Sequence, residues 1–355
     1  MIVLYIILAI LIFGFLILVH ELGHFMTAKL FGVRVNEFSI CMGPAILQKT
    51  VGETTYALRC IPVGGYCARE GEDEASDDPK AFTSAKAWKR AVILLAGSAM
   101  NFLAGFLILI VMYSAVAGFT TAKITDFYPD CPLESAEGLQ VGDELYRIDG
   151  RRVYLYSDIT MLMARNKTSV FDLEVRRDGK LIKLNDFPMT RQAYTEDGQT
   201  VYRYGMYFGY EDKTVGTVLK NAWYSALDFA RMVWMSLSDL LQGLVSLNDM
   251  SGPVGIVSVI AQTGASAETA GVAALNISYL GAFIAVNLAV MNLLPVPALD
   301  GGRVFFLVIT SLIEKLSKRK IDPKYEGYIH AAGMVLLLLF IAFITMKDIW
   351  KLIAT

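Results

Sequence analysis

The chain has 355 residues, of which 55% are hydrophobic and 19% charged, and its mean hydropathy is +0.47. Soluble domains are less apolar and carry about a quarter of charged residues, so this composition excludes a wholly soluble protein and indicates a membrane protein with a soluble portion. The formal net charge of -2 gives no reason to expect a nucleic-acid partner. The spacing of the cysteines fits neither a zinc finger nor a disulfide framework: Cys41, Cys60, Cys67 and Cys131.

The first segment, residues 1–30, joins a membrane helix to a metal-binding pattern. Residues 1–19 form an unbroken apolar run, long enough to cross most of a bilayer, and lead directly into His20-Glu21-Leu22-Gly23-His24. Histidines four apart lie on one face of a helix and can reach one metal ion, while the glutamate can act as a base toward a water there. The run has no basic n-region and no small-residue cleavage site, so we expect a retained helix rather than a signal peptide.

The second segment, residues 31–90, is a polar insert. Residues 33–68 are rich in β-branched and aromatic side chains and are punctuated by glycine, notably at Gly64-Gly65, which predicts a small β-hairpin or meander. Residues 71–80 are acidic and indicate a loop.

A second membrane helix is predicted over residues 91–119, and the largest soluble block follows at 120–215. In this block residues 171–184 alternate in polarity and turn at Asp178-Gly179, a β-hairpin signal. A turn, a strand and another turn are predicted over 138–150. The pattern fits one β-rich domain of ordinary size.

Residues 216–270 are predicted to hold an amphipathic helix and a linker. Asp228, Arg231 and Asp239 favour a helix on the membrane surface over one that crosses it. The remaining segments are a third membrane helix at 271–302, a cytoplasmic loop at 303–329 and a fourth membrane helix at 330–351. The expected fold class is a multi-pass α-helical membrane protein with about four transmembrane helices, a β insert and one β-rich domain.

Basic residues predict the topology. They gather before the second helix and between the third and fourth, at Lys80, Lys86, Lys89, Arg90, Arg303, Lys315, Lys318, Arg319, Lys320 and Lys324. Basic loops stay in the cytoplasm, which places the domain at 120–215 outside and the His20/His24 end of the first helix on the cytoplasmic side.

A catalytic zinc usually has three protein ligands and a water, so two histidines leave one ligand missing. The candidate is Asp300, in the stretch Asn292-Leu293-Leu294-Pro295-Val296-Pro297-Ala298-Leu299-Asp300-Gly301-Gly302. Two prolines break the third helix there, and Asp300 at such a break can point back at the first helix. The alternative is that residues 299–302 form a simple loop turn.

The chain resembles the site-2 protease family, and within it the bacterial regulator-of-sigma-E protease group. The matching stretches cover most of the chain: His20–His24, Gly32–Ile40, Gly43-Pro44, Ile61–Tyr66, Gly97–Phe102, Gly252–Ile256 and Asn292–Gly302. The resemblance implies a zinc-dependent intramembrane endopeptidase in which His20, His24 and Asp300 hold Zn²⁺ and Glu21 is the general base.

The resemblance of Ile61–Tyr66 implies that the insert at 31–90 re-enters the membrane from the cytoplasmic side. The resemblance also implies partners and a location. The substrates would be single-span membrane proteins, such as anti-sigma factors, or signal-peptide remnants, cut within the bilayer of a bacterial inner membrane. Cys131 to Gly150 resembles the first half of a PDZ domain, and there is room for one copy outside the cytoplasm, which would gate entry or bind substrate C-termini.

A helical substrate must unwind before it is cut, because its carbonyls are hydrogen-bonded within the helix. A free strand edge at Gly64-Gly65 could capture the unwound segment, and Asn292 and Asn287 could hold its backbone near the metal. For Asn287 an interhelical hydrogen bond is an equal alternative.

Two other functions fit the sequence. A membrane-anchored metalloprotease with a cytosolic site would not need Asp300. A non-catalytic scaffold that uses a PDZ-like domain would not need Glu21.

Overall fold

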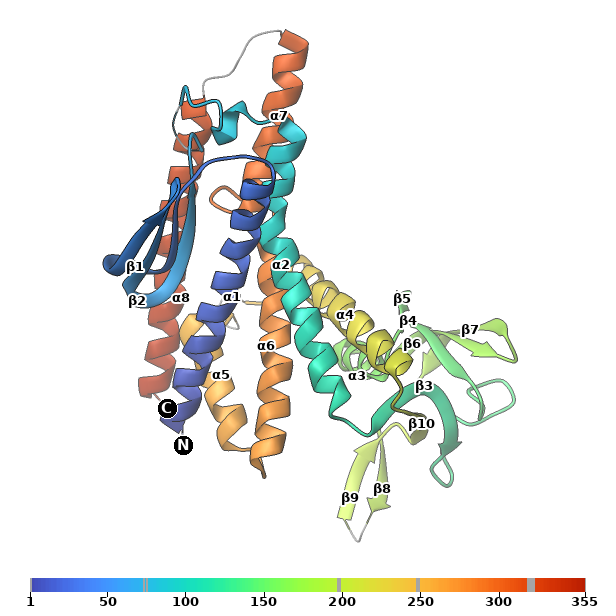
Figure 1. The fold of residues 1–355 in the computed structure, drawn as a ribbon. Helices are drawn as coiled ribbons and strands as arrows, with labels where there is room; N and C mark the ends of the chain where they lie inside the picture. Colours follow the sequence, from blue (N-terminus) through green and yellow to red (C-terminus); the bar gives the residue numbers. More distant parts are fainter. Residues whose placement is uncertain are drawn as a thin grey trace. The chain divides into compact units, whose positions relative to one another are not determined.

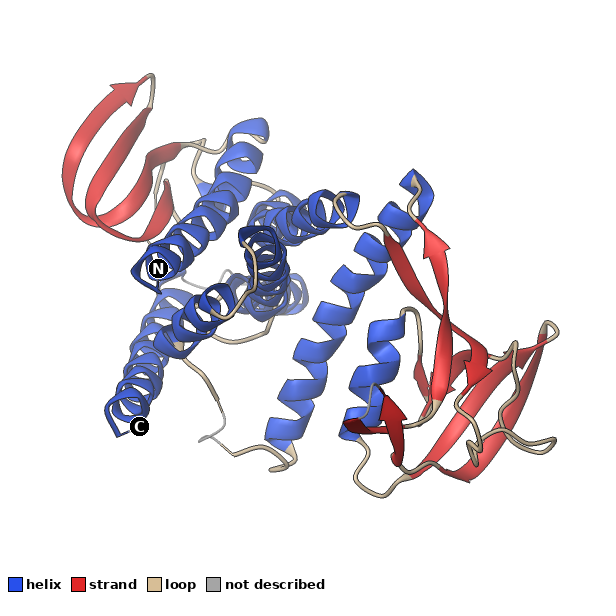
Figure 2. Ribbon diagram, turned by 90° about the horizontal axis from the view of Figure 1, so that it is seen from below, coloured by secondary structure: helices blue, strands red, loops and turns tan. Residues whose placement is uncertain are grey.

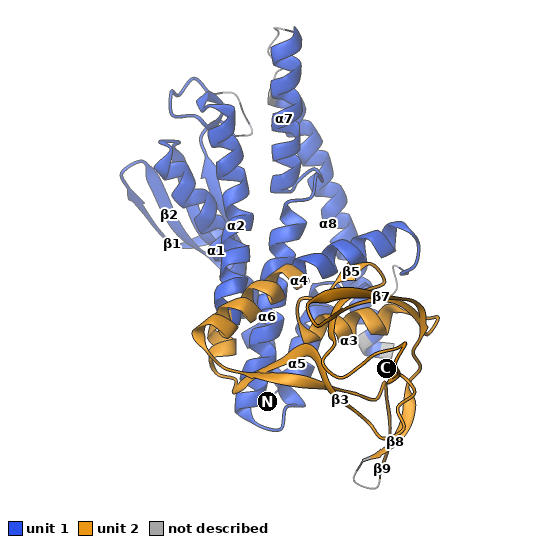
Figure 3. Ribbon diagram, turned by 90° about the vertical axis from the view of Figure 1, so that its right-hand side faces the viewer, with its two compact units in different colours: residues 1–109, 229–355 blue, residues 110–228 orange. Residues whose placement is uncertain are grey.

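The computed structural model describes residues 2–72, 74, 76–196, 199–246, 250–317 and 323–354. The chain divides into two compact units, residues 1–109 with 229–355 and residues 110–228 (Figure 3). Each unit is described separately. Lys318, Arg319 and Lys320, which contributed to the predicted topology, lie outside the described residues.

Helices dominate the first unit (Figure 1). They are α1 (Ile2–Leu30), α2 (Ala87–Ser114), α4 (Val215–Leu241), α5 (Pro253–Ala265), α6 (Ala270–Asn292), α7 (Asp300–Ser317) and α8 (Pro323–Ala354), with α2 and α4 crossing into the second unit. Among the described residues, 4 helices are long and apolar enough to span a membrane: Ile2–Leu30, Ala87–Ser114, Ala270–Asn292 and Lys324–Lys351. This confirms the expected four apolar helices.

The boundaries of several segments differ from those expected. The second helix begins at Ala87 and ends at Ser114 rather than covering 91–119, because Lys89 and Arg90 form part of its first turns. The apolar stretch 253–265, expected as linker, is the helix α5, with Pro253 at its start, where proline's fixed φ suits a helix.

The expected loop at 303–329 is also different, since α7 occupies residues 300–317 and α8 begins at Pro323. Apolar residues recur along one face of α7, and Leu307 is buried in the core, so packing stabilises this helix despite its charges.

Strands β1 (Val35–Val51) and β2 (Thr54–Arg69) form the insert. Both strands bend, so that residues 35–40 pair with 55–58 on one side and with 65–69 on the other. The insert is therefore a meander in which 65–69 is an edge segment, and β2 packs beside α1 (Figures 1 and 2). A short helix, Phe82–Ser84, leads from the insert to α2.

Packing in the first unit has two centres. One joins the insert to α1, α2 and α7 around Val35, Phe38, Phe82, Ile93 and Leu307. The other joins α1, α2, α5 and α6 around Leu16, Ala104, Ile260, Ile284 and Ala285. Both centres hold α1, which carries the histidine motif, in place.

The second unit is built on an antiparallel sheet with strand order β10-β3-β4-β6-β7, and β5 pairs with β4. These strands are β3 (Gly118–Phe127), β4 (Glu144–Ile148), β5 (Arg151–Arg152), β6 (Val170–Arg177), β7 (Lys180–Pro188) and β10 (Met206–Asp212). Helix α3 (Tyr156–Arg165) packs on β3 and β4, and β8 (Gln192–Glu196) pairs with β9 (Gln199–Arg203) as a separate hairpin. Asp178 and Gly179 adopt φ of 48° and 78° between β6 and β7, as the hairpin signal predicts.

Candidate active site

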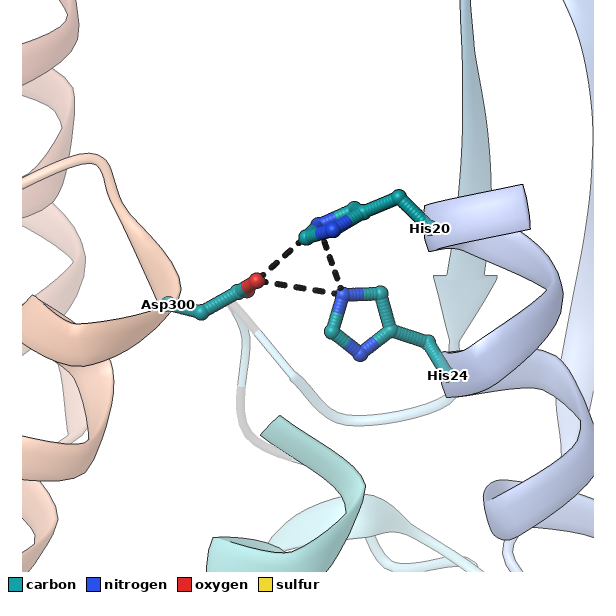
Figure 4. Close-up of side chains that lie close together, drawn as sticks. All are labelled: His20, His24 and Asp300. Atoms are coloured by element: carbon teal, nitrogen blue, oxygen red, sulfur yellow. Dashed lines mark hydrogen bonds and ion pairs between the residues drawn. The ribbon is translucent and has the colours of Figure 1, made fainter. Parts of the chain in front are cut away.

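Three side chains from two distant parts of the chain converge on one point (Figure 4). His20 and His24 project from the same face of α1, and Asp300 is the first residue of α7. Asp300 Oδ2 lies 3.0 Å from His20 Nε2 and 3.2 Å from His24 Nε2, and the two Nε2 atoms are 3.1 Å apart. The expected trio is thus brought together in space.

The partners of the two imidazoles decide which nitrogens carry protons. His24 Nδ1 lies 2.8 Å from the Ile93 carbonyl oxygen, which can only accept, so Nδ1 donates and Nε2 keeps a lone pair. His20 Nδ1 lies 3.3 Å from the Asn101 amide nitrogen, while the amide oxygen of Asn101 has no partner among the described residues. If the side-chain amide of Asn101 is turned over, its oxygen accepts a hydrogen bond from His20 Nδ1. His20 then has the same tautomer as His24, with a lone pair on Nε2.

This arrangement tests whether the residues fit a metal. Asp300 Oδ2 is buried and receives no hydrogen bond, although two imidazole nitrogens lie within 3.2 Å of it. Three lone pairs would then face one another with no proton between them, which is unfavourable without a cation. Ligand atoms around tetrahedral zinc are about 3.3 Å apart when the bonds are about 2.0 Å long. The separations observed are close to that value, so the three residues fit zinc.

Glycines at the contact between α1 and α2 leave room for the two imidazole rings. A methyl group at Gly97 of α2 would lie 2.5 Å from His24 Nε2 and 2.7 Å from His20 Cε1. On α1, a methyl group at Gly23 would lie 2.5 Å from the Ala96 carbonyl oxygen. Glycines on both helices therefore let α1 and α2 approach closely enough for α2 to contact the imidazoles.

The turn before α7 determines where Asp300 lies. Pro295 and Pro297 end the helical hydrogen bonding after α6, and Ala298 adopts a φ of 82°, in the left-handed region. Added methyl groups at Gly301 and Gly302 would lie 2.3 Å and 2.1 Å from backbone atoms of Leu293 and Val296. The two glycines after Asp300 thus let α7 start directly against the end of α6. The helix dipole at this N-terminus also favours the carboxylate.

Glu21 and the glycines of the insert lie on the α1 side of the site. Glu21 follows His20, so it is about 100° around the helix from the ligand face. A methyl group at Gly65 would lie 3.8 Å from Glu21 Cγ, which places the edge segment of β2 beside Glu21. Gly64 has a φ of 83° and turns the chain into this segment.

The structure does not bring Asn287 and Asn292 into the trio. Both lie on α6, Asn292 as its last residue, and both are partly buried. Their role in binding substrate stays a prediction.

A buried charge cluster joins the insert to α7. Arg69 donates from Nε to Glu72 Oε2 at 2.6 Å and from Nη2 to Glu72 Oε1, and Arg303 Nη1 lies 3.1 Å from the same Oε1. Burial lowers the pKa of Arg69, but Glu72, together with Cys67 and Asp300, raises that pKa by more, so this guanidinium stays charged. Arg303 is one turn after Asp300, and the cluster therefore ties the end of β2 to the helix that presents Asp300.

Sequence reasoning missed Ile93, Gly97, Asn101, Arg69 and Glu72. The stretch Gly97–Phe102 was noticed only as a resemblance. A glycine and an asparagine four apart on an apolar helix gave the signal that could have pointed to a close helix contact with a polar partner.

The fold and the trio together define a membrane-embedded metallopeptidase. The profile of peptidase family M50 matches residues 8–340, and the chain belongs to this family, the site-2 proteases, which are zinc-dependent. A Clostridium acetobutylicum protein, named as a zinc metalloprotease, is 37% identical over 97% of both chains. The zinc metalloprotease RasP of Oceanobacillus iheyensis is 28% identical over 97% of this chain and 98% of its own. The regulator of sigma-W protease RasP of Bacillus subtilis is 27% identical over 97% of both chains.

Proposed function

We propose that this zinc metalloprotease cuts peptide bonds within the transmembrane segments of single-span membrane proteins, with His20, His24 and Asp300 as its metal ligands and Glu21 as its general base. The observation that carries the proposal is the convergence of three possible ligand atoms, two imidazole nitrogens and one carboxylate oxygen, within 3.2 Å of one another. All three atoms belong to the first unit, which holds all or most of each of the four apolar helices. Hydrolysis requires that water reach the metal among these helices.

Each residue has a defined task in this proposal. When bound, zinc supplies Lewis acidity, which favours deprotonation of a water and polarises a peptide carbonyl. Glu21 takes the proton of the attacking water and passes it to the leaving amine. Ile93 holds His24, and Asn101 with its amide turned would hold His20, in the tautomer that offers Nε2.

The substrate would bind as an added strand. Residues 65–69 pair with 35–40 on one side only, according to the pairings among the described residues, and Gly65 lies beside Glu21. An unwound segment paired with this edge would pass close to the general base. Asn292 and Asn287 would hold its backbone nearer the end of α6.

The second unit would be a PDZ-like domain, present in one copy, of the kind that proteases of the regulator-of-sigma-E type carry outside the cytoplasm. A groove of about 490 Å³ lies between α3, β9 and the start of β10, and β10 is an end strand of its sheet. Tyr156 and Phe208 meet across this groove, with ring centroids 5.0 Å apart. A substrate C-terminus would add beside β10 and place its last side chains against α3.

The proposed location is a bacterial inner membrane, with the second unit outside the cytoplasm. The basic residues before α2 and after α7 would stay in the cytoplasm. The name of the Bacillus subtilis relative, regulator of sigma-W protease, supports a regulatory role. The substrate in such a role would be an anti-sigma factor.

Co-expression with a panel of single-span substrates tests the function. Glu21→Gln keeps the size of the side chain and removes the base, so we expect cleavage to fall at least about 100-fold while zinc stays bound. Asp300→Ala should lose zinc, and so should His20→Ala/His24→Ala. Cleavage at the wild-type rate by Glu21→Gln would refute the general-base assignment. No cleavage of any substrate by the wild type would favour a scaffold, and full activity of Asp300→Ala would favour a cytosolic site that does not use α7.

A further inference from the structure

The third histidine of the chain is also buried near the site, but it is not one of the three converging residues. His330 lies on α8 and is 5% exposed. Its Nδ1 accepts a hydrogen bond from the Ala298 backbone N–H at 3.0 Å. Ala298 precedes Asp300 by two residues, so α8 is bonded to the turn that presents the carboxylate.

This turn has few internal hydrogen bonds to hold it. Pro295 and Pro297 have no N–H, and Ala298 has the φ of 82° that residues other than glycine rarely adopt. Two backbone hydrogen bonds lie inside the turn: the Val296 N–H donates to the Leu294 carbonyl at 2.7 Å, and the Leu299 N–H donates to the Val296 carbonyl at 3.1 Å. The Ala298 N–H instead points out of the turn, and its acceptor is the side chain of another helix.

The surroundings of His330 suit an acceptor at Nδ1. Because Nδ1 accepts, the ring proton is on Nε2, which lies 3.8 Å from Glu326 Oε1 one helical turn earlier. The Phe306 ring packs edge-on at 5.5 Å between centroids. Three residues beyond His330, an added methyl group at Gly333 would lie 2.5 Å from Pro297 Cβ, so the same face of α8 contacts the turn a second time.

We propose that His330 is a positioning residue of the metal centre: its Nδ1 holds the Ala298 N–H and so keeps Asp300 at the distance from His20 and His24 that zinc requires. This inference rests on the proposed role of Asp300 as a ligand. A partner that orients a metal ligand typically affects metal affinity 10–100-fold. His330 would do so through the backbone, without touching the metal.

Two variants with an amide side chain, His330→Asn and His330→Gln, test whether the acceptor at the place of Nδ1 is what matters. In His330→Asn the side-chain oxygen can take the place of Nδ1, whereas in His330→Gln it lies one bond further out, near the place of Nε2. We expect zinc affinity within about threefold of wild type for His330→Asn and a loss of about 10–100-fold for His330→Gln. Affinity is measured by competition with a chelator, using the full chain in detergent. Tyr328→Asn, at a 71% exposed position of the same helix, is the matched control and should bind zinc normally.

The outcomes separate this inference from the proposed function. Equal zinc affinities for the Asn and Gln variants would overturn the positioning role, whether both are normal or both are weak, since a structural role would not distinguish them. If His330→Gln does not fold, His330→Asn still decides, because loss of zinc in a folded Asn variant would overturn the role. Normal zinc affinity in Asp300→Ala would instead refute the ligand assignment itself.

Discussion

A methyl group on Gly97 would lie 2.5 Å from Nε2 of His24, the atom that we assign to the metal. Atoms at this distance overlap, so one of them must move. The backbone of α2 is held against α1 by tight packing around Gly23, and His24 is held by its bond to Ile93. The imidazole is the part that can yield, at the cost of that hydrogen bond.

Gly97→Ala should therefore weaken zinc binding by at least about tenfold, because it displaces a ligand that a hydrogen bond orients. Helix propensity alone would make this change favourable by up to about 1 kcal/mol. Gly14→Ala on α1 is the matched control, since an added methyl group there meets nothing within 4 Å. Zinc competition assays on both variants check the expectation, and unchanged affinity in Gly97→Ala would show that the helices can separate.

The buried cluster around Glu72 predicts a large effect on stability. The Arg69 and Glu72 side chains are 6% and 8% exposed, and Arg303 shares the same carboxylate. Glu72→Gln leaves buried positive charge without compensation, which should cost about 3 kcal/mol and lower the midpoint of thermal unfolding in detergent by several degrees.

Glu53→Gln is the control for Glu72. The Glu53 carboxylate pairs with Lys29 and Lys80 at the surface, where ion pairs contribute little. Equal midpoints for the two variants would mean that the Glu72 cluster is as well solvated as the surface pairs.

The chemical groups of the site were predictable, but its packing was not. The spacing of His20 and His24 fixes their common helix face, and the prolines before Asp300 indicate a break that can carry a carboxylate. By contrast, Ile93 and Asn101 reach the rings across 69 and 81 residues of sequence, and His330 reaches Ala298 across 32. No local spacing encodes such contacts, because they depend on which helices pack together.

The same distinction between local and long-range contacts explains which elements of the fold could be predicted from the sequence. Long apolar runs and the Asp178-Gly179 turn carry local signals, and the four apolar helices and the hairpin were predicted from them. Helix α7 was expected as a loop because its charges, Arg303 and Lys315, suggested solvent. The role of its apolar face follows only from the structure, in which Leu307 packs with the insert, α1 and α2.

Cys67 provides a test of how tightly the insert packs. Burial raises the pKa of its thiol to about 12, so at pH 8 only about one thiol in ten thousand is ionised. In the folded protein Cys67 should resist maleimide at pH 8 and react faster as the pH rises. The exposed Cys60 should already react at pH 8. Mass spectrometry of the labelled peptides distinguishes the two, and equal labelling would mean that the insert opens from α1 and α2.

The orientation of the chain in the membrane can be tested with two engineered cysteines. In a variant whose four natural cysteines are replaced, Lys180→Cys lies at the exposed start of β7 and Lys315→Cys near the end of α7. The positive-inside rule places position 180 outside and position 315 in the cytoplasm. An impermeant maleimide added to intact cells should therefore label position 180 only, and permeabilised cells should show both. Labelling of position 315 but not of position 180 would reverse the proposed orientation, and would move the His24 end of α1 to the outer side of the bilayer.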